Sequence, residues 1–198
     1  GGKGRDYSNS YGTGYGGIGG LVKFNLVLSA SATVVIEKIT NDGQYGAAFR
    51  VMVDGTVVAV CGGGGNGSAN YNDSLGHDAS FYDGGNGGGT TGEDGETNYY
   101  TQGLGALIGE GGTGGLDIRG DGSPGQDGYD SDDATYPGKG GKGHPDGHGG
   151  CGYAGGGGGA YNYPSWGIRR GAGGGGSSYV ATRTGLTLLI NSQGTPEL

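Results

Sequence analysis

Alternating apolar and polar residues in 21–28 and 47–53, together with short β-branched or apolar runs, predict β-strands near both ends of the chain. The predicted strands cover residues 21–28, 33–39, 47–53, 56–61 and 186–190, the last preceded by the pair Tyr179-Val180. Turns are predicted at residues 29–32, at Asn41-Asp42-Gly43 and at Asp54-Gly55. No stretch repeats its apolar residues at the spacing of about 3.6 that a helix needs. We therefore expect a small antiparallel sheet or sandwich and essentially no α-helix.

Glycine clusters interrupt the middle of the chain and supply no side chains for a core. They cover residues 62–65, 84–89, 109–115, 138–143, 147–152, 155–159 and 171–176, in a chain with 57 glycines among 198 residues. A glycine run becomes ordered only where its backbone N–H and C=O groups find partners. Polyglycine-II helices have three residues per turn, and they can hydrogen-bond side by side because no Cβ separates them. The alternatives are irregular turns on a β-sandwich, or disorder.

The expected fold is therefore mainly β plus polyglycine II. It is a small antiparallel β-sandwich with an inserted bundle of polyglycine-II helices. Residues 1–61 form a β-rich part with a glycine- and tyrosine-rich N-terminal segment. Residues 62–179 form the helix bundle with variable loops, and residues 180–198 supply a returning strand that completes the β part.

Charge and composition exclude several classes of partner. The net charge of −8 and the pI near 4.6 disfavour nucleic acids and anionic membranes, because both need clusters of lysine and arginine. No apolar run reaches the roughly 20 residues of a membrane span, so no membrane insertion is expected. The chain shows no signal peptide and begins with Gly1-Gly2, as a piece of a longer protein would. The pair Cys61 and Cys151 is compatible with one disulfide or with two buried thiols.

The segments between the glycine clusters are the strongest functional signal. They combine aromatic rings with Asn, Ser, Asp and Gly, the composition of binding loops. The candidate binding residues are Tyr71, Phe81, Tyr82, Tyr99, Tyr100, Tyr129, Tyr136, Tyr161, Tyr163, Trp166, Arg169 and Arg170. Residues 160–170 are the first choice, since they join tyrosine, tryptophan and arginine, the usual hot-spot residues. Alternatively, the rings are apolar cover for the glycine clusters, and we expect roughly half of them to be exposed.

Other motifs give weaker indications of chemistry. His144, His148 and Cys151, with Cys61, have a spacing that would suit a metal, but loop histidines are the commoner explanation. Carboxylates at residues 93–96 and 127–133 would suit calcium, but solvated loops explain them better. The short Arg119-Gly120-Asp121 motif occurs often by chance. No nucleophile and base share a supporting fold context, so the sequence predicts neither an enzyme nor a cofactor or metal site.

The glycine clusters and the variable segments between them resemble the receptor-recognition domain of T-even-type phage tail-fibre adhesins. The resemblance covers about residues 62–179 and implies a polyglycine-II bundle whose loops recognise outer-membrane proteins or lipopolysaccharide. The loops implied are residues 66–83, 90–108, 116–137 and 160–170.

The order of strands and glycines over most of the chain also resembles the glycine-rich domain of anaplastic lymphoma kinase-type receptors. Residues 16–22 lead into alternating strands, residues 58–61 run into the first cluster, and residues 173–176 run into residues 177–180. This resemblance implies a β-sandwich with inserted polyglycine-II helices and a ligand-binding role.

Both resemblances indicate binding rather than catalysis. We expect a receptor-binding adhesin module at a phage tail-fibre tip, extracellular or on the virion surface. Its partners would be a bacterial outer-membrane protein or surface glycan, and the rest of a fibre. The alternatives are a structural subunit of an extracellular filament or matrix, and the ligand-binding glycine-rich domain of a cell-surface receptor. An ice-binding role needs a flat face of small residues, which the bulky, charged segments here argue against.

Overall fold

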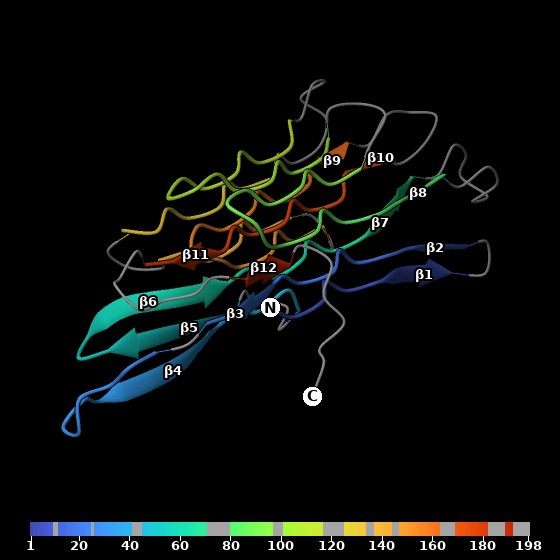
Figure 1. The fold of residues 1–198 in the computed structure, drawn as a ribbon. Helices are drawn as coiled ribbons and strands as arrows, with labels where there is room; N and C mark the ends of the chain where they lie inside the picture. Colours follow the sequence, from blue (N-terminus) through green and yellow to red (C-terminus); the bar gives the residue numbers. More distant parts are fainter. Residues whose placement is uncertain are drawn as a thin grey trace.

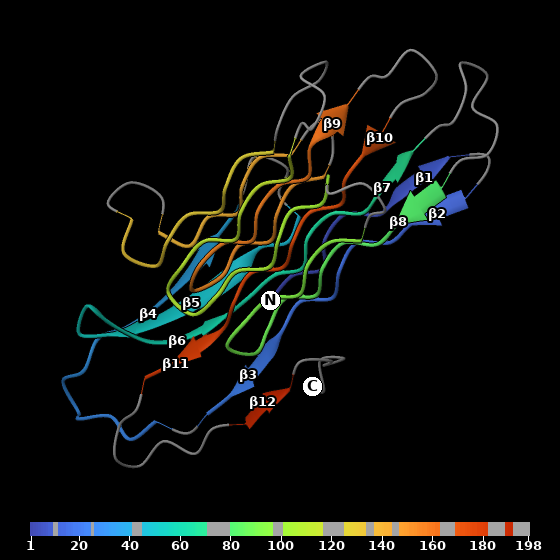
Figure 2. The same cartoon turned by 90° about the horizontal axis from the view of Figure 1, so that it is seen from above.

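The fold is taken from a computed structural model, shown in Figure 1 and, turned by 90°, in Figure 2. It describes residues 1–9, 12–24, 26–40, 45–70, 80–96, 101–116, 125–133, 137–143, 147–162, 169–181 and 189–191. These residues form short β-strands and extended segments, and none of them forms a helix. The predicted mainly β, non-helical character is therefore confirmed for the described chain.

The largest sheet has four strands in the order β11-β6-β5-β4, all antiparallel. Its strands are β4 (Val34–Ile39), β5 (Ala48–Val53), β6 (Thr56–Cys61) and β11 (Tyr179–Val180). Asp54 and Gly55 join β5 to β6 with φ angles of 50° and 78°, the left-handed conformation that a tight hairpin turn requires. The predicted strands at residues 33–39, 47–53 and 56–61 and the predicted turn at Asp54-Gly55 are therefore confirmed.

The strand predicted at residues 21–28 is much shorter in the structure. Only β3 (Leu21–Lys23) is a strand, and it pairs with β12 (Leu189–Asn191). Val27 is 90% exposed. The apolar alternation therefore continues beyond the point where a neighbouring strand is available. The turn predicted at residues 29–32 is confirmed by a hydrogen bond from Ala32 N–H to the Ser29 carbonyl. The predicted turn at residues 41–43 lies outside the described residues.

Three further hairpins come from stretches that alternation did not mark as strands. β1 (Tyr7–Asn9) pairs with β2 (Gly12–Gly14), β7 (Ser68–Asn70) with β8 (Ser80–Tyr82), and β9 (Tyr161–Asn162) with β10 (Arg169–Arg170). In Figures 1 and 2 all three lie at one end of the molecule, and the four-stranded sheet lies at the other. We call these the hairpin end and the sheet end.

The glycine segments run side by side between these two ends, as undulating traces in Figure 2. Backbone hydrogen bonds join them in a regular pattern. In residues 62–67 the backbone N–H groups of five consecutive residues, 63 to 67, each donate to a carbonyl of another segment. The acceptors are, in order, the carbonyls of Cys151, Gly2, Gly85, His148 and Arg5. The first and fourth donors reach one neighbouring segment, and the second and fifth reach another. The direction of the N–H groups therefore repeats every three residues.

The same repeat surrounds residues 171–178, which lie among several other glycine segments. Gly171, Gly174 and Ser177 donate to the carbonyls of Ala160, Gly157 and Ala154, each over 3.0 Å. Gly173 and Gly176 donate to Asn66 and Gly63, and Gly175 and Ser178 to Glu93 and Gly89. The carbonyls in turn accept from other segments, as Ala172 does from Gly103 and Gly175 from Ala106. Most of the backbone groups buried here are paired with other backbone groups, and the Oγ atoms of Ser177 and Ser178 accept from Ala154 and Gly62 N–H.

Glycine is required because the segments approach too closely for a Cβ. An ideal Cβ added at Gly156 would come closer than 3.0 Å to the carbonyl oxygen of Gly174. One added at Gly65 would overlap the carbonyl of Gly173 in the same way. The clusters are therefore glycine because backbone packs directly on backbone.

Residues 1–20 join this glycine network although they precede the predicted bundle. Gly2 donates to Ala47, Gly4 to Gly17, and Gly17 to Gly65. Backbone hydrogen bonds therefore connect residues 1–61 to residues 62–179 across the predicted division at residue 61.

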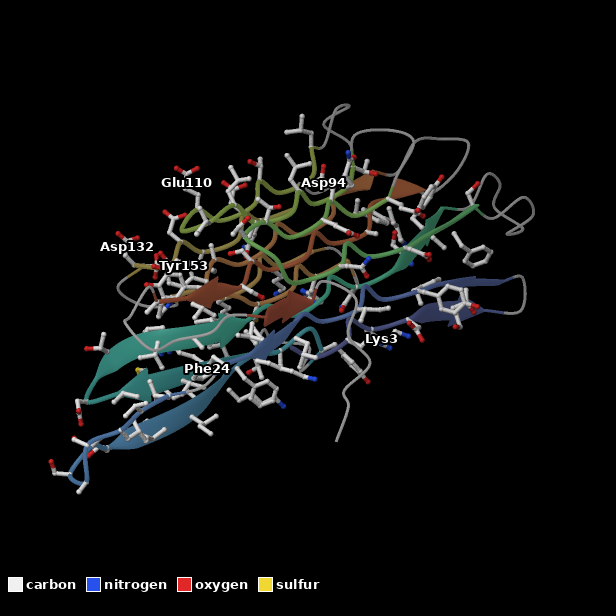
Figure 3. The ribbon with its side chains drawn as sticks, in the orientation of Figure 1. Lys3, Phe24, Asp94, Glu110, Asp132 and Tyr153 are labelled. Atoms are coloured by element: carbon white, nitrogen blue, oxygen red, sulfur yellow. The ribbon has the colours of Figure 1, made fainter. Side chains whose placement is uncertain are left out.

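A small apolar cluster joins the four-stranded sheet to the glycine segments. Ala48, Val60 and Cys151 are fully or nearly fully buried, and four side chains pack against them: Ile39, Val57, Tyr153 and Tyr179. The rings of Tyr153 and Tyr179 stack with centroids 4.1 Å apart, and Figure 3 shows Tyr153 above the sheet. Cys61 and Cys151 are both free thiols. Of the two arrangements left open by the sequence, the structure contains the unbonded one.

Candidate functional site

The hairpin end gathers segments that lie far apart in the sequence. β7 contacts both β10 and β2, and β2 also contacts β8. The strands of these hairpins lead into residues 71–79 and 163–168, which lie outside the described residues. This end of the molecule therefore holds the described ends of two of the aromatic segments between glycine clusters (Figure 1).

Arg170 organises the base of this end. Its guanidinium carbon lies 5.7 Å from the ring centroid of Tyr7 and 5.8 Å from that of Tyr161. Its Nη1 donates to the Tyr7 hydroxyl over 3.3 Å, and its carbonyl accepts a hydrogen bond from Ser68 Oγ. Cation–π contacts of this kind contribute about 0.5–1 kcal/mol each at partly exposed sites. Arg170 thus connects β10 to β1, β7 and β9.

The predicted binding residues in the described chain divide between the two ends. Phe81, Tyr82, Tyr161, Arg169 and Arg170 belong to strands of the hairpin end. Tyr129 lies toward the sheet end, where its carbonyl accepts from Gly155 and its N–H donates to Lys139. The remaining predicted residues lie outside the described residues: Tyr71, Tyr99, Tyr100, Tyr136, Tyr163 and Trp166.

Some of these rings cover the framework, as the alternative interpretation expected. Tyr82 is only 8% exposed. The half-buried Phe81 ring lies over Gly12, where an added Cβ would be 2.5 Å from the ring. Phe81 and Tyr82 therefore support the hairpin end more than they present a surface. Tyr161 and Arg170 are partly exposed.

A shallow groove of about 420 Å³ lies between residues 15–18, 83–86 and 93–96. Tyr15, Asp83, Asn86, Glu93, Asp94 and Glu96 line it, together with backbone. Asp94 marks its position in Figure 3. The Asp83 carboxylate accepts from Tyr15 N–H over 2.7 Å, and Asp94 from Gly105 N–H over 2.8 Å. These carboxylates complete the hydrogen bonding of neighbouring backbone.

Asp and Asn side chains accept hydrogen bonds from outward-pointing backbone N–H groups at several places on the surface of the glycine segments. Asp127 and Asp130 accept from Gly114 and Gly111, both over 2.7 Å. Asp83 and Asn86 likewise accept from Tyr15 and Ile18, each over 2.7 Å. In both pairs the acceptors and the donors are three residues apart, which matches the repeat of the backbone. Sequence reasoning treated residues 127–133 as solvated loops and missed this role, although the Asp-x-x-Asp spacing was visible.

Asp6 makes the same kind of contact beside a lysine. Its carboxylate accepts from Lys3 Nζ over 3.0 Å and from Gly16 N–H over 2.7 Å. The hydrogen bond from Lys3, followed by the one from Gly16, holds the pKa of Asp6 below its usual value. The carboxylate is therefore ionised at neutral pH and remains a good acceptor.

The residues of the metal hypothesis have other roles in the structure. Cys151 is buried in the apolar cluster, and its Sγ accepts from Gly140 N–H over 3.4 Å. His148 Nδ1 accepts from Gly143 N–H, and Cys61 Sγ donates weakly to the Phe49 carbonyl. His144 lies outside the described residues. No group of three or more His, Cys, Asp or Glu side chains within the described chain has the arrangement of a metal site.

Comparisons with family models, curated proteins and solved structures find no match for this chain. Among the described residues, no helix is long and apolar enough to cross a membrane.

Proposed function

We propose that the glycine segments form a bundle of polyglycine-II helices that acts as a rigid support for binding loops. The three-residue repeat of N–H directions around residues 62–67 and 171–178 supports this assignment, because polyglycine II has three residues per turn. The close backbone approach at Gly156 supports it as well. The sandwich predicted from the sequence remains part of this proposal, with β3 and β12 as the second layer.

The module that we infer is a receptor-binding adhesin, at the tip of a phage tail fibre, that recognises a bacterial surface protein or glycan. The observation that carries the proposal is the collection of β1–β2, β7–β8 and β9–β10 at one end of the molecule (Figure 1). Such an arrangement lets several aromatic segments act on one surface. Variation of those segments leaves the glycine packing untouched, because the packing is made by backbone.

The chemistry of the hairpin end suits recognition better than catalysis. Tyrosine offers rigid amphipathic area at low entropic cost, and Arg170 is held in place by two tyrosine rings. A net charge of −8 disfavours nucleic acid. The affinity of one module need not be high, because several fibres engaging one cell multiply the effect of each contact.

The test is binding of the fluorescently labelled protein to intact Gram-negative cells from a broad strain panel. One variant carries Tyr161→Ala, Tyr163→Ala and Trp166→Ala, all in the segment 160–170 that the sequence marks as the first choice. A matched control carries Leu107→Ala and Ile108→Ala, two exposed apolar side chains at the far end of the glycine segments.

Saturable binding to some strains, lost in the first variant and kept in the control, is the expected result. Absence of binding to every strain by the folded protein would contradict the proposal. Equal loss of binding in both variants would contradict the location of the site.

A further inference from the structure

The outer edge of β4 is unpaired within the described residues. β4 is the last strand of its sheet and pairs only with β5. Asp54 N–H donates to the Thr33 carbonyl over 2.9 Å, and Thr33 N–H donates to the Asp54 carboxylate over 2.8 Å, so residue 33 bonds toward the β5 side. The backbone groups of an antiparallel strand alternate between its two sides. Residues 34, 36 and 38 therefore direct their N–H and C=O groups to the open edge.

The side chains along this edge are apolar and exposed. Ile36 is 70% exposed, Val34 is 43% exposed and Val35 is 38% exposed. Natural proteins usually protect an edge of this kind with a proline, a bulge or several charges. β4 contains no proline, and its register with β5 runs from residue 34 to residue 39 without a bulge. The edge is therefore able to accept a further strand.

Charge at this edge selects neither an acidic nor a basic partner. Arg50 Nε donates to Glu37 over 3.0 Å, so the one carboxylate of β4 is already paired. Residues 21–61 contain three cations and three carboxylates and have no net charge, whereas the whole chain has a net charge of −8. All of the net negative charge therefore lies in other parts of the chain. Two copies of this acidic chain repel each other least where they meet through residues 21–61.

We propose that β4 pairs antiparallel with β4 of a second copy, about a twofold axis at Ile36. Residues 34, 36 and 38 of one copy then lie opposite residues 38, 36 and 34 of the other. Every outward N–H and C=O group of these residues finds a backbone partner, and the two four-stranded sheets become one continuous sheet. The contact uses the same surface on both copies, as twofold homodimers do, and these are the commonest oligomers of soluble proteins.

The side chains of β4 are compatible with this register. Ile36, the most exposed residue of the strand, lies opposite Ile36 of the second copy. Val34 lies opposite Lys38, whose aliphatic stem can cover it while the ammonium group stays in water. Val35 lies opposite Glu37, which keeps its ion pair with Arg50. No like charges are directly opposite each other.

Other registers of the same strand are less favourable. A twofold axis at Glu37 or at Lys38 sets two like charges directly opposite each other. An axis at Val34 or Val35 brings the second half of β4 opposite the turn at residues 29–32. There the Ala32 N–H is already bonded to the Ser29 carbonyl over 3.1 Å. The axis at Ile36 therefore pairs the most backbone groups without opposing like charges.

Pairing at this edge leaves the hairpin end of each copy accessible, because β4 lies at the sheet end (Figures 1 and 2). Antiparallel pairing reverses the strand direction, and β6 leads directly into the glycine segments that run to the hairpin end. The hairpin ends of the two copies therefore point in opposite directions, which suits a dimer that bridges two surfaces. The dimer does not depend on what the hairpin end binds.

The first test is sedimentation of the reduced protein from about 1 μM to about 1 mM. Ile36→Lys sets two lysines opposite each other at the axis, and the exposed position leaves the fold intact, which an NMR fingerprint spectrum checks. Val27→Lys is the matched control, because it makes the same change of charge at a side chain that is 90% exposed and lies outside β4. The wild type and the control should dimerise, and Ile36→Lys should dimerise at least about tenfold more weakly.

The second test reads the register by disulfide formation under mild oxidation. In the proposed register Ile36→Cys lies opposite itself, at the Cα separation of about 5.5 Å that a disulfide accepts. Ile36→Cys should therefore form a cross-linked dimer, and Val35→Cys and Val27→Cys should not. A wild-type protein that stays monomeric up to about 1 mM would overturn the proposal. Equal dimerisation of Ile36→Lys would overturn the choice of the β4 edge, and cross-linking through Val35→Cys in place of Ile36→Cys would overturn the register.

Discussion

The glycine segments and the four-stranded sheet solve the same problem by opposite means. Each must bury backbone N–H and C=O groups with their partners. The sheet pairs its strands in one plane and covers one face with Val60, Ala48 and Cys151. The glycine segments pair in several directions at once, because each is surrounded by other segments and consists mostly of glycine. One region depends on side-chain packing, and the other depends on the absence of side chains.

In the proposed function, this difference separates the support from the binding loops. A framework held by backbone contacts places no demand on the sequence of the loops that leave it. The sheet, in contrast, restricts its residues through an apolar cluster. We therefore expect substitutions to have very different effects in the two regions, and the four predictions below are ordered from the largest effect to the smallest.

A methyl group in the centre of the glycine segments should be the most damaging change. Gly156→Ala places a Cβ against the Gly174 carbonyl, where only rigid backbone is available to move. We expect a loss of about 3 kcal/mol or more in the free energy of unfolding. Gly55→Ala is the control, because nothing lies within 4 Å of its Cβ and only the positive φ of 78° is strained. That control should lose about 1 kcal/mol in urea unfolding. Equal losses in the two variants would contradict backbone-on-backbone packing.

Truncating a buried side chain of the sheet should lower the free energy of unfolding by less, and its effect should be confined to the sheet. Val60→Ala leaves a small cavity beside Ala48 and Cys151. We expect a loss of roughly 2 kcal/mol. Amide exchange should accelerate in β5 and β6 more than in residues 171–178. Uniform acceleration would show that the sheet and the glycine segments unfold as one unit.

The Asx acceptors on the surface should each contribute a small amount. Asp127→Ala and Asp130→Ala remove the acceptors of Gly114 and Gly111. We expect each substitution to lower the free energy of unfolding by about 1 kcal/mol, because water can partly replace the lost acceptor at both N–H groups. Asp132→Ala is the control, an exposed aspartate of the same stretch with no such contact among the described residues. If amide exchange at Gly111 and Gly114 is unchanged in the double variant, these carboxylates are not the acceptors.

Acid should weaken the contact at Asp6, with the smallest effect of the four. The pKa of Asp6 is lower in the folded protein than in the unfolded chain. The stability that it contributes is therefore present above the unfolded pKa and is lost as pH falls through the folded pKa. Asp6→Asn should remove this part of the pH dependence of stability between about pH 5 and pH 2. The measurement is the unfolding midpoint against pH, and a variant with an unchanged acid limb would contradict the assignment.

The four-stranded sheet was predicted well, because its strands and turns have recognisable side-chain patterns. The alternation in residues 47–53 and the Asp54-Gly55 turn were enough to place β5 and its returning strand β6. Alternation also predicted too long a strand at residues 21–28, because it does not indicate where a partner strand ends. Val27 continues the apolar run and is nevertheless exposed.

The pairing of the glycine segments could not be predicted from the sequence. Glycine has no side chain that distinguishes one register from another, so nothing in the sequence indicates that Gly174 N–H donates to the Gly157 carbonyl. The N-terminal segment joined the network unexpectedly for the same reason. The three-residue spacings of Asp127 with Asp130 and of Asp83 with Asn86 were readable signs of the three-residue repeat, because those side chains accept from the backbone N–H groups that follow it.

Part of the candidate site was predicted from composition alone. Aromatic and arginine content marked residues 160–170, and the structure places Tyr161 and Arg170 at the hairpin end. Composition did not separate Tyr129, which lies toward the other end. The involvement of Tyr7 with Arg170 was missed, because contacts between distant segments depend on the glycine pairing.

Scalar couplings across hydrogen bonds, measured by NMR on the isotopically labelled protein, test the glycine framework most directly. The account predicts couplings from the amide nitrogens of Gly171, Gly174 and Ser177 to the carbonyl carbons of Ala160, Gly157 and Ala154. It also predicts that Gly173 and Gly176 couple to Asn66 and Gly63, a different segment. Couplings that alternate between two neighbouring segments with a period of two residues, as in a β-sheet, would contradict the three-residue repeat and the bundle proposed from it.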